Sequence, residues 1–536
     1  MIPASEPVSR AVLTSQKQSE VMFEVLTDQE GGFATVTAHW TAPRTPMSLM
    51  NTVQTAVYEK TVNEMGEVVC AMVRKTLRDQ RIPVADVAFR HVGTFDMVAD
   101  ESFRFEVTVK DTSVADAENA LKAALASIDA NGASANELIL AEEIYFNGLE
   151  ARRYGYDRTN AAYVRMCSRA FLMNAPLVAS SQRLAFLRSK SISPESRERI
   201  FFGISSALIT LPDGSPAAGP KLYFNASDTL SFPSAGPVVK LRSSKKEPLS
   251  GGSVLTFSNG FKVVYKKMKT AGKLHYTLAM NGGYGDVADL AKGEAAFMSD
   301  YLDICNISGM KARDFKRALL LSGITMNQQV NLSNITISGE VRDGNVPLLM
   351  KALLAVANER TQDENAVAYH LESEKLRLLY AHEDMRAVID SLMCPDYRYS
   401  PYKSSGNIPE DFAAKAESLF AKMSSKMNDG VLVIVGDIAE DVLKKALLEY
   451  VGAFSTSSTA YRRPVVKYQP VSGWSTYTVD GYDNSVDIAM SARMPLTAGN
   501  YAAAAVAAKM LEQRIVEHMS EAGMYVSVSQ NCRIYP

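Results

Sequence analysis

The sequence is poor in the residues that build hydrolytic metal sites. Its six histidines include no pair three to five residues apart, and its five cysteines are odd in number and widely separated. Hydrolytic zinc sites commonly pair two ligands one helical turn apart, and zinc ribbons pair cysteines closely. The sequence therefore indicates neither a metal centre nor a CxxC redox motif. The one local cluster, His382-Glu383-Asp384, is interpreted as a solvated helix end, because ligating groups need burial and convergence.

Several other features are also missing. The net charge is −2 with both signs interspersed, which argues against a nucleic-acid footprint. No apolar run approaches the ~20 residues that span a bilayer. Residues 1–10 lack a signal-peptide pattern, so a periplasmic or secreted location would require a signal peptide upstream. No phosphate-binding or nucleophile-elbow motif occurs, and the glycine-rich run Asn281–Gly285 is interpreted as a turn.

The patterns that are present indicate an α+β protein with more than one domain. Hydrophobic residues make up 47% and charged residues 22% of 536 residues, enough for roughly three to four domains. Period-two alternation predicts strands at 33–40, 84–91 and 103–109. Helical spacing predicts a long helix over 47–80 and another capped by Ser113. Ser134-x-x-Glu137 is a capping box that predicts a further helix.

The same succession recurs later in the chain. Helices are expected at 292–307 and 313–321, strands at 324–330 and 334–341, and then a helix capped by Asn345. The charged helix expected at 364–384 is interpreted as a solvated outer face. At the strand-to-helix joints, Val109-Lys110-Asp111-Thr112-Ser113-Val114 matches Val341-Arg342-Asp343-Gly344-Asn345-Val346. We interpret this match as an internal repeat of an α+β unit.

A third copy begins near the end of the chain. Asn500 is expected to cap an alanine-rich helix that ends near Gly523, and a strand-like run follows at 525–529. About 70 residues are too few to close a core like those of the other copies, so truncation is expected. Between the first two copies, residues 211–252 are rich in proline, serine and glycine and are predicted to be a linker.

The start of the second copy resembles one half of an M16 (insulinase/pitrilysin-type) zinc peptidase. A turn and strand at 258–265 and the Asn281–Asp286 turn precede a helix that begins near Gly293. In an active half, this helix carries His-x-x-Glu-His. The matching five positions here read Ala296-Phe297-Met298-Ser299-Asp300, so the motif is degenerate at Ala296, Ser299 and Asp300.

The resemblance implies a domain order. Residues 1–210 resemble the second domain of the first half, 211–252 the linker, and 253–462 a third domain with a degenerate zinc helix. Residues 463–536 resemble a truncated fourth domain. Each M16-type domain is an antiparallel-rich mixed sheet packed by helices. By this numbering the catalytic first domain would precede Met1.

The resemblance also suggests two substrate-binding residues. In active members the fourth domain lends an arginine and a tyrosine, seven residues apart, to polarise the scissile carbonyl. Tyr525 can fill the tyrosine position, whereas the arginine position holds His518, or Glu517 if the register slips by one. Histidine lacks the permanent charge of a guanidinium. The alternative is that Tyr525 simply packs at the start of a strand.

The implied function is that of a non-metal portion of a zinc peptidase. The chain would form a chamber wall around an extended peptide or unfolded segment, while hydrolysis occurs in a missing N-terminal catalytic domain. It would hold no cofactor and be inactive alone, with zinc expected for the full-length enzyme. The alternative is a catalytically inactive M16-like scaffold, or the partner subunit of a processing peptidase pair. An unrelated α+β binding protein would have to treat the repeat as coincidence.

Overall fold

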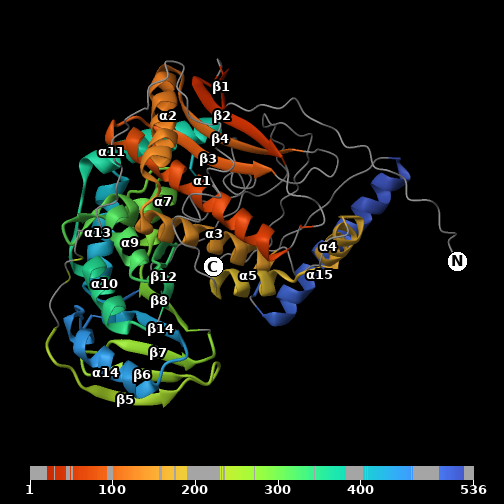
Figure 1. Cartoon of the computed structure of the whole chain (residues 1–536). Helices are drawn as coiled ribbons and strands as arrows, with labels where there is room; N and C mark the ends of the chain where they lie inside the picture. Colours follow the sequence, from red (N-terminus) through yellow and green to blue (C-terminus); the bar gives the residue numbers. More distant parts are fainter. Residues whose placement is uncertain are drawn as a thin grey trace.

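The structure, a computed structural model, contains two α+β units and one separate C-terminal helix (Figure 1). The residues that it describes are 21–28, 31–43, 49, 52–92, 100–155, 160–173, 177–189, 230, 232, 236–270, 272–342, 344–381, 403–404, 406, 408–459, 461–462, 494–495 and 497–523. Unit 1 comprises the described residues from 21 to 189, and unit 2 those from 236 to 459. Both contain sheets packed by helices, which confirms the predicted α+β class.

Unit 1 contains a four-stranded antiparallel sheet in the order β1-β2-β4-β3. Its strands are β1 (Met22–Asp28), β2 (Phe33–Pro43), β3 (Val84–Val92) and β4 (Asp100–Lys110). The alternation in β2 is confirmed, because Ala34, Val36, Ala38 and Trp40 are all buried against the helices. A strand that buries one face alternates apolar and polar residues in this way.

The helices of unit 1 are α1 (Val53–Asp79), α2 (Val114–Asn131), α3 (Ala135–Gly155), α4 (Asn160–Met173) and α5 (Ser180–Ser189). α1 and α2 pack on the sheet, and α3 and α5 pack against α1. The helix expected from residue 47 begins instead at Val53, because the Thr52 hydroxyl accepts from the Thr55 N–H and caps it. The capping box is confirmed: Ser134 N–H donates to Glu137 at 2.8 Å, and Glu137 N–H donates to Ser134 Oγ at 3.3 Å.

Unit 2 contains a seven-stranded mixed sheet in the order β11-β12-β8-β14-β7-β6-β5. Its strands are β5 (Leu241–Lys246), β6 (Ser253–Phe257), β7 (Lys262–Lys267), β8 (Lys273–Asn281), β11 (Asn327–Val330), β12 (Asn334–Arg342) and β14 (Val431–Gly436). β14 inserts between β7 and β8 and runs parallel to β7. A small second sheet joins β9 (Asn306–Ile307), β10 (Met310–Lys311) and β13 (Arg360–Thr361).

The helices of unit 2 are α7 (Glu294–Phe297), α8 (Tyr301–Ile304), α9 (Ala312–Leu321), α10 (Val346–Asn358), α11 (Glu364–Tyr380), α13 (Phe412–Ser424) and α14 (Glu440–Tyr450). The expected Asn345 cap is confirmed, because its side chain accepts from Leu348 N–H at 3.2 Å. β5 lies inside the segment predicted as a linker, so paired structure begins before residue 253.

The two units share a three-stranded arrangement and contact each other through related pairs. β2 pairs with β4 from Phe33↔Lys110, as β8 pairs with β12 from Lys273↔Arg342. From these equivalent strand ends, Lys110 binds Glu372 on α11 of unit 2, and Arg342 binds Glu143 on α3 of unit 1. The repeat predicted from the joint sequences is therefore reproduced in the three strands β2-β4-β3 and β8-β12-β11, whereas β14 is inserted beside β8 in unit 2.

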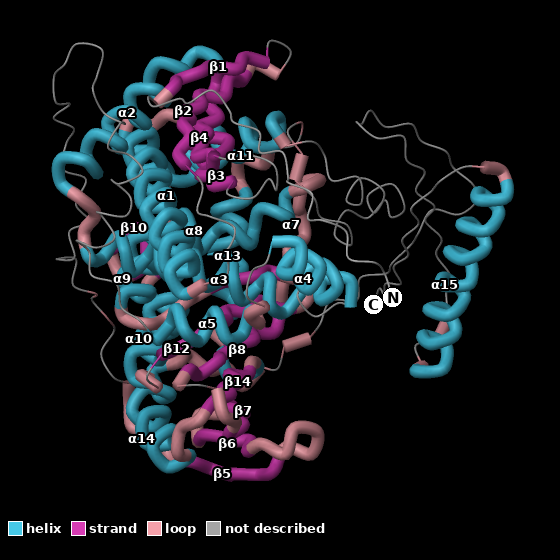
Figure 2. The backbone as a smooth tube through the Cα atoms, turned by 45° about the vertical axis from the view of Figure 1, so that its right-hand side comes forward, coloured by secondary structure: helices cyan, strands magenta, loops and turns pink. Residues whose placement is uncertain are grey.

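The remaining helix, α15 (Ala498–Glu521), stands apart from both units (Figure 2). It is capped by Thr497 rather than by the expected Asn500, whose N–H donates to Thr497 Oγ1 at 3.1 Å. Gly523, with a φ of +75°, follows its C-terminus as expected. Among the described residues, no helix is long and apolar enough to cross a bilayer.

Candidate functional site

The stretch that matches the metal-binding helix is broken rather than continuous. Sequence spacing predicted one helix over 292–307, but α7 gives way to a 3-10 turn at Met298–Asp300 and then to α8. Gly293 at its start has a φ of +81°, and Cys305 at its end is extended. The β9–β10 hairpin then intervenes before α9. Helical spacing in the sequence could not reveal this break, because the buried positions Phe297, Met298 and Tyr301 keep a helical pattern.

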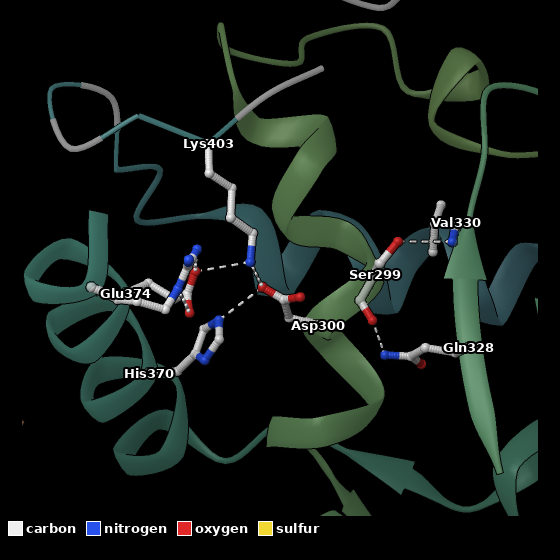
Figure 3. Close-up of polar contacts among 8 residues, drawn as sticks. Ser299, Asp300, Gln328, Val330, His370, Glu374 and Lys403 are labelled. Carbon is white, nitrogen blue, oxygen red and sulfur yellow. Dashed lines mark hydrogen bonds and ion pairs between the residues drawn. The ribbon is translucent and has the colours of Figure 1, made fainter. Parts of the chain in front are cut away.

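Ser299 occupies the position where an active member carries its general base, and it has a structural role here. Its Oγ accepts a hydrogen bond from the Val330 backbone N–H at 2.9 Å, and its carbonyl accepts from the Gln328 side chain (Figure 3). Both partners lie on β11, at the edge of the sheet. Ser299 therefore fastens the 3-10 turn to β11.

Asp300 occupies the last position of the degenerate motif and lies at the centre of an ion-pair network (Figure 3). Its Oδ2 contacts Lys403 Nζ at 2.5 Å and His370 Nε2 at 3.0 Å. The Lys403 ammonium also lies 4.9 Å from the centre of the Phe297 ring. Asp300 is thus engaged by two basic side chains from distant parts of the sequence.

Glu374 extends the network along α11. It receives hydrogen bonds of 2.9 Å from Arg377 Nε and Nη2 and one of 2.9 Å from Lys403 Nζ. Burial by itself would raise the pKa of Glu374, but Arg377 and Lys403 outweigh it and hold that pKa at about 2. The helix predicted to be a solvated outer face is therefore partly inward-facing, because α11 lies against both the Asp300 turn and β3 of unit 1.

The network suits charge neutralisation rather than metal chemistry. Lys403 supplies an ammonium within 2.9 Å of two carboxylates, so a fixed cation already compensates them. No group of three or more His, Cys, Asp or Glu in the described part of the chain is placed to hold a metal ion. Ala296 has no polar side-chain atom, and Ser299 is committed to β11.

Of the two predicted substrate-binding residues, the structure describes only His518. His518 is exposed near the end of α15, which stands apart from α7 and α11 (Figure 2). Tyr525 and the His382–Asp384 cluster lie outside the described residues. The role assigned to Tyr525 and His518 therefore stays a prediction.

Sequence reasoning missed three members of the network: His370, Glu374 and Lys403. His370 and Glu374 are four residues apart on a helix, so a shared face could have been read from their spacing. Lys403 gave no signal, because it lies 103 residues from Asp300 in the chain and meets it only in the folded unit.

Comparisons with known proteins bear on this architecture. No family model matches the chain. The chain is 22% identical over 587 residues to the probable zinc protease PqqL of Escherichia coli, and the match covers 100% of this chain and 61% of that protein. The chain therefore spans less than two thirds of the length of this relative.

Solved structures are similar at a low level. The periplasmic protease PqqL from Escherichia coli matches with a TM-score of 0.38 and 17% identity, over 87% of this chain and 53% of that one. A mutant of the ferredoxin protease FusC, in complex with Arabidopsis ferredoxin, matches with a TM-score of 0.40 and 13% identity. This match covers 88% of this chain and 54% of that one. A peptidase M16 inactive domain from Pseudomonas fluorescens matches with a TM-score of 0.32 and 12% identity. This match covers 39% of this chain and 53% of that one.

The sequence match along the whole chain confirms the predicted resemblance. The chain is similar along its whole length to part of a longer probable zinc protease.

Proposed function

We propose that this chain is a non-metal portion of an M16-type zinc peptidase. It forms part of the wall around an extended peptide, and hydrolysis takes place in a catalytic domain that this chain does not contain. In this layout, unit 1 corresponds to a second domain, unit 2 to a third domain and α15 to part of a fourth. Zinc belongs to the catalytic domain of the full-length enzyme.

One observation carries the proposal: the turn that replaces the metal-binding helix is committed to structural contacts. Asp300 and Glu374 share the Lys403 ammonium, and Ser299 binds β11. Breaking such a network would leave carboxylates without their cation, which is costly in a partly buried site. The helix therefore supports packing of unit 2, in a protein related to a zinc protease.

The test measures polypeptide binding and cleavage separately on the full chain. We expect fluorescein-labelled, unfolded β-casein to bind saturably, measured by fluorescence anisotropy, and to remain uncleaved on gels with or without added zinc. Folded proteins of similar size serve as the matched control and are expected not to bind. Cleavage that a chelator abolishes would contradict the absence of a catalytic site, and failure to bind any unfolded polypeptide would contradict the wall function.

The rival proposal is an inactive scaffold that assembles with a partner subunit and handles no peptide. The same experiment separates the two, because a scaffold is expected to bind neither unfolded β-casein nor short peptides. Size-exclusion chromatography of the chain mixed with its candidate catalytic domain would then report the assembly directly.

A further inference from the structure

Unit 1 contains a cavity that the proposed function does not use. It has a volume of about 410 Å³ and lies between α1, α3 and α5, with Phe89 of β3 in its lining. This size falls within the range of small-ligand sites, about 300–1,000 Å³. The cavity is built entirely from unit 1, whereas the Asp300 network belongs to unit 2.

One wall of the cavity offers hydrogen-bond acceptors in a row. Glu59, Asn63 and Glu67 lie four residues apart on α1, so they share one helical face with about 6 Å between successive positions. Asn63 uses its amide N–H to reach the Glu59 carbonyl at 2.7 Å, which leaves its side-chain oxygen as the acceptor. Glu67 accepts from Arg74 through one oxygen at 2.8 Å. The wall therefore favours a ligand that donates hydrogen bonds.

The opposite wall is mostly apolar. Ile144 and Leu149 of α3 line it, together with the Phe89 ring. Gly66 allows the close approach of that ring, because a Cβ on Gly66 would lie 2.1 Å from it. An alkyl stem can lie along this wall while a charged head reaches α1.

A guanidinium of the protein already occupies one end of the cavity. Arg183 of α5 binds the Glu59 carboxylate, and burial, which would lower the pKa of Arg183, is outweighed by Glu59, so that this pKa is raised. The Arg183 Nε is buried and has no acceptor among the described residues. The cavity thus accepts a guanidinium against α1, and Glu67, which accepts from Arg74 through one oxygen, keeps its other oxygen as an acceptor for a second donor.

The neighbouring buried lysine does not neutralise this wall. Lys60 is fully buried and is bound by Glu64 at 2.7 Å and Glu142 at 2.5 Å, away from the three lining residues. Its charge is therefore balanced within its own cluster. Glu59 pairs with Arg183 and Glu67 with Arg74, so the row offers a ligand their second carboxylate oxygens and the Asn63 side-chain oxygen.

We propose that this cavity is a binding site for a guanidinium or ammonium group on a short alkyl stem, as in an arginine or lysine side chain. The charged head binds Glu67 and Asn63, the stem lies along Phe89 and Ile144, and Arg183 competes for Glu59. This site does not depend on the proposed peptidase role, because any donor of this chemistry would fit it.

Butylguanidinium and its neutral isostere butylurea test the charge requirement on the full chain. We expect saturable binding of butylguanidinium by isothermal titration calorimetry, with butylurea at least roughly tenfold weaker. Glu67→Gln should weaken butylguanidinium binding by roughly tenfold, since it removes the charge and keeps the shape. Glu118→Gln is the matched control, because this carboxylate pairs with Lys122 on α2, outside the cavity.

Two further variants should change the affinity for butylguanidinium in opposite directions. Arg183→Met frees Glu59 and keeps the alkyl stem, so it should strengthen butylguanidinium binding by a few fold. Gly148→Leu places a side chain in the cavity, where a Cβ meets no atom within 4 Å, and should abolish binding without unfolding the chain. Circular dichroism melts confirm that each variant is folded.

Three results would overturn the proposal. The first is equal binding of butylurea and butylguanidinium, and the second is no saturable binding to either the natural chain or Arg183→Met. The third is weaker binding to Arg183→Met combined with binding of butyrate, which would make Arg183 the centre of an anion site.

Discussion

Units 1 and 2 share a three-stranded arrangement, β2-β4-β3 in unit 1 and β8-β12-β11 in unit 2, but differ in the helix that follows β2 and β8. In unit 1 it is α1, a continuous helix of 27 residues; in unit 2 it is divided into α7, a 3-10 turn and α8. Each unit nevertheless links this element to a later helix by polar side chains, through Lys60–Glu142 in unit 1 and Asp300–His370 in unit 2. The two units therefore share a side-chain link at this place although the helices differ.

The two links differ in burial and therefore in expected cost. The Lys60 side chain is fully buried and also pairs with the fully buried Glu64, whereas Asp300 and its partner His370 are each about one fifth exposed. Breaking a buried pair leaves an uncompensated charge, which costs more than breaking a partly solvated one. The comparison predicts that breaking the link in unit 1 lowers the free energy of unfolding more than breaking the link in unit 2.

The largest effect is expected for Lys60→Met. It removes the buried ammonium that Glu64 and Glu142 share, so the free energy of unfolding of unit 1 should fall by about 3–5 kcal/mol. Urea denaturation followed by tryptophan fluorescence measures this, because Trp40 lies in the core of unit 1. Lys75→Met, whose exposed pair with Asp79 should contribute under about 1 kcal/mol, is the control. Equal losses in both variants would break the comparison.

A smaller loss is expected for Lys403→Met, about 2 kcal/mol, because Asp300 and Glu374 lose the ammonium that they share. Chemical denaturation followed by circular dichroism measures it. Lys422→Met is the control, because its Nζ lies 3.7 Å from Asp286 and its side chain is half exposed. A loss greater than that of Lys60→Met would reverse the ranking of the two units.

The dependence of stability on pH below 4.5 should show how much Glu374 contributes to it. Its pKa is lowered to about 2, below its ordinary value of 4.5, so its stabilising effect is complete above pH 4.5 and is lost as the pH falls towards 2. Glu374→Gln should therefore make the denaturation midpoint less dependent on pH between 4.5 and 2. A variant whose acid limb parallels that of the natural chain would show that Glu374 is not held by Arg377 and Lys403.

The smallest effect is expected where the units meet at the surface. Lys110 and Glu372 are about half exposed, so Lys110→Ala should cost under about 1 kcal/mol, and less at high salt. A double-mutant cycle with Glu372→Ala measures the coupling. Arg342 and Glu143 form the related pair with a buried carboxylate, so the matching cycle should give a larger coupling. Equal couplings would argue against a role for burial.

Much of this fold could be predicted from local sequence signals. Ser134-x-x-Glu137 and Asn345 marked helix starts correctly, and the alternation in β2 marked its buried face. These features depend on residues a few positions apart. Thr52 and Thr497 were missed as caps because several polar residues near each helix start could serve.

The candidate site was less predictable, because it depends on distant residues. The motif positions Ala296, Ser299 and Asp300 could be identified from sequence as lacking a ligand set. Their actual partners, Val330 and Lys403, are brought to them only by tertiary packing. The 3-10 turn that follows Phe297 likewise packs against β11 and α13, which come later in the chain.

Zinc content tests the central claim most directly, namely that the degenerate motif binds protein side chains in place of a metal. The full chain, incubated with zinc and then desalted, should contain well under one zinc per molecule by mass spectrometry. Asp300→Asn should leave that content unchanged while lowering stability. One tightly held zinc per molecule, lost in Asp300→Asn, would contradict the account.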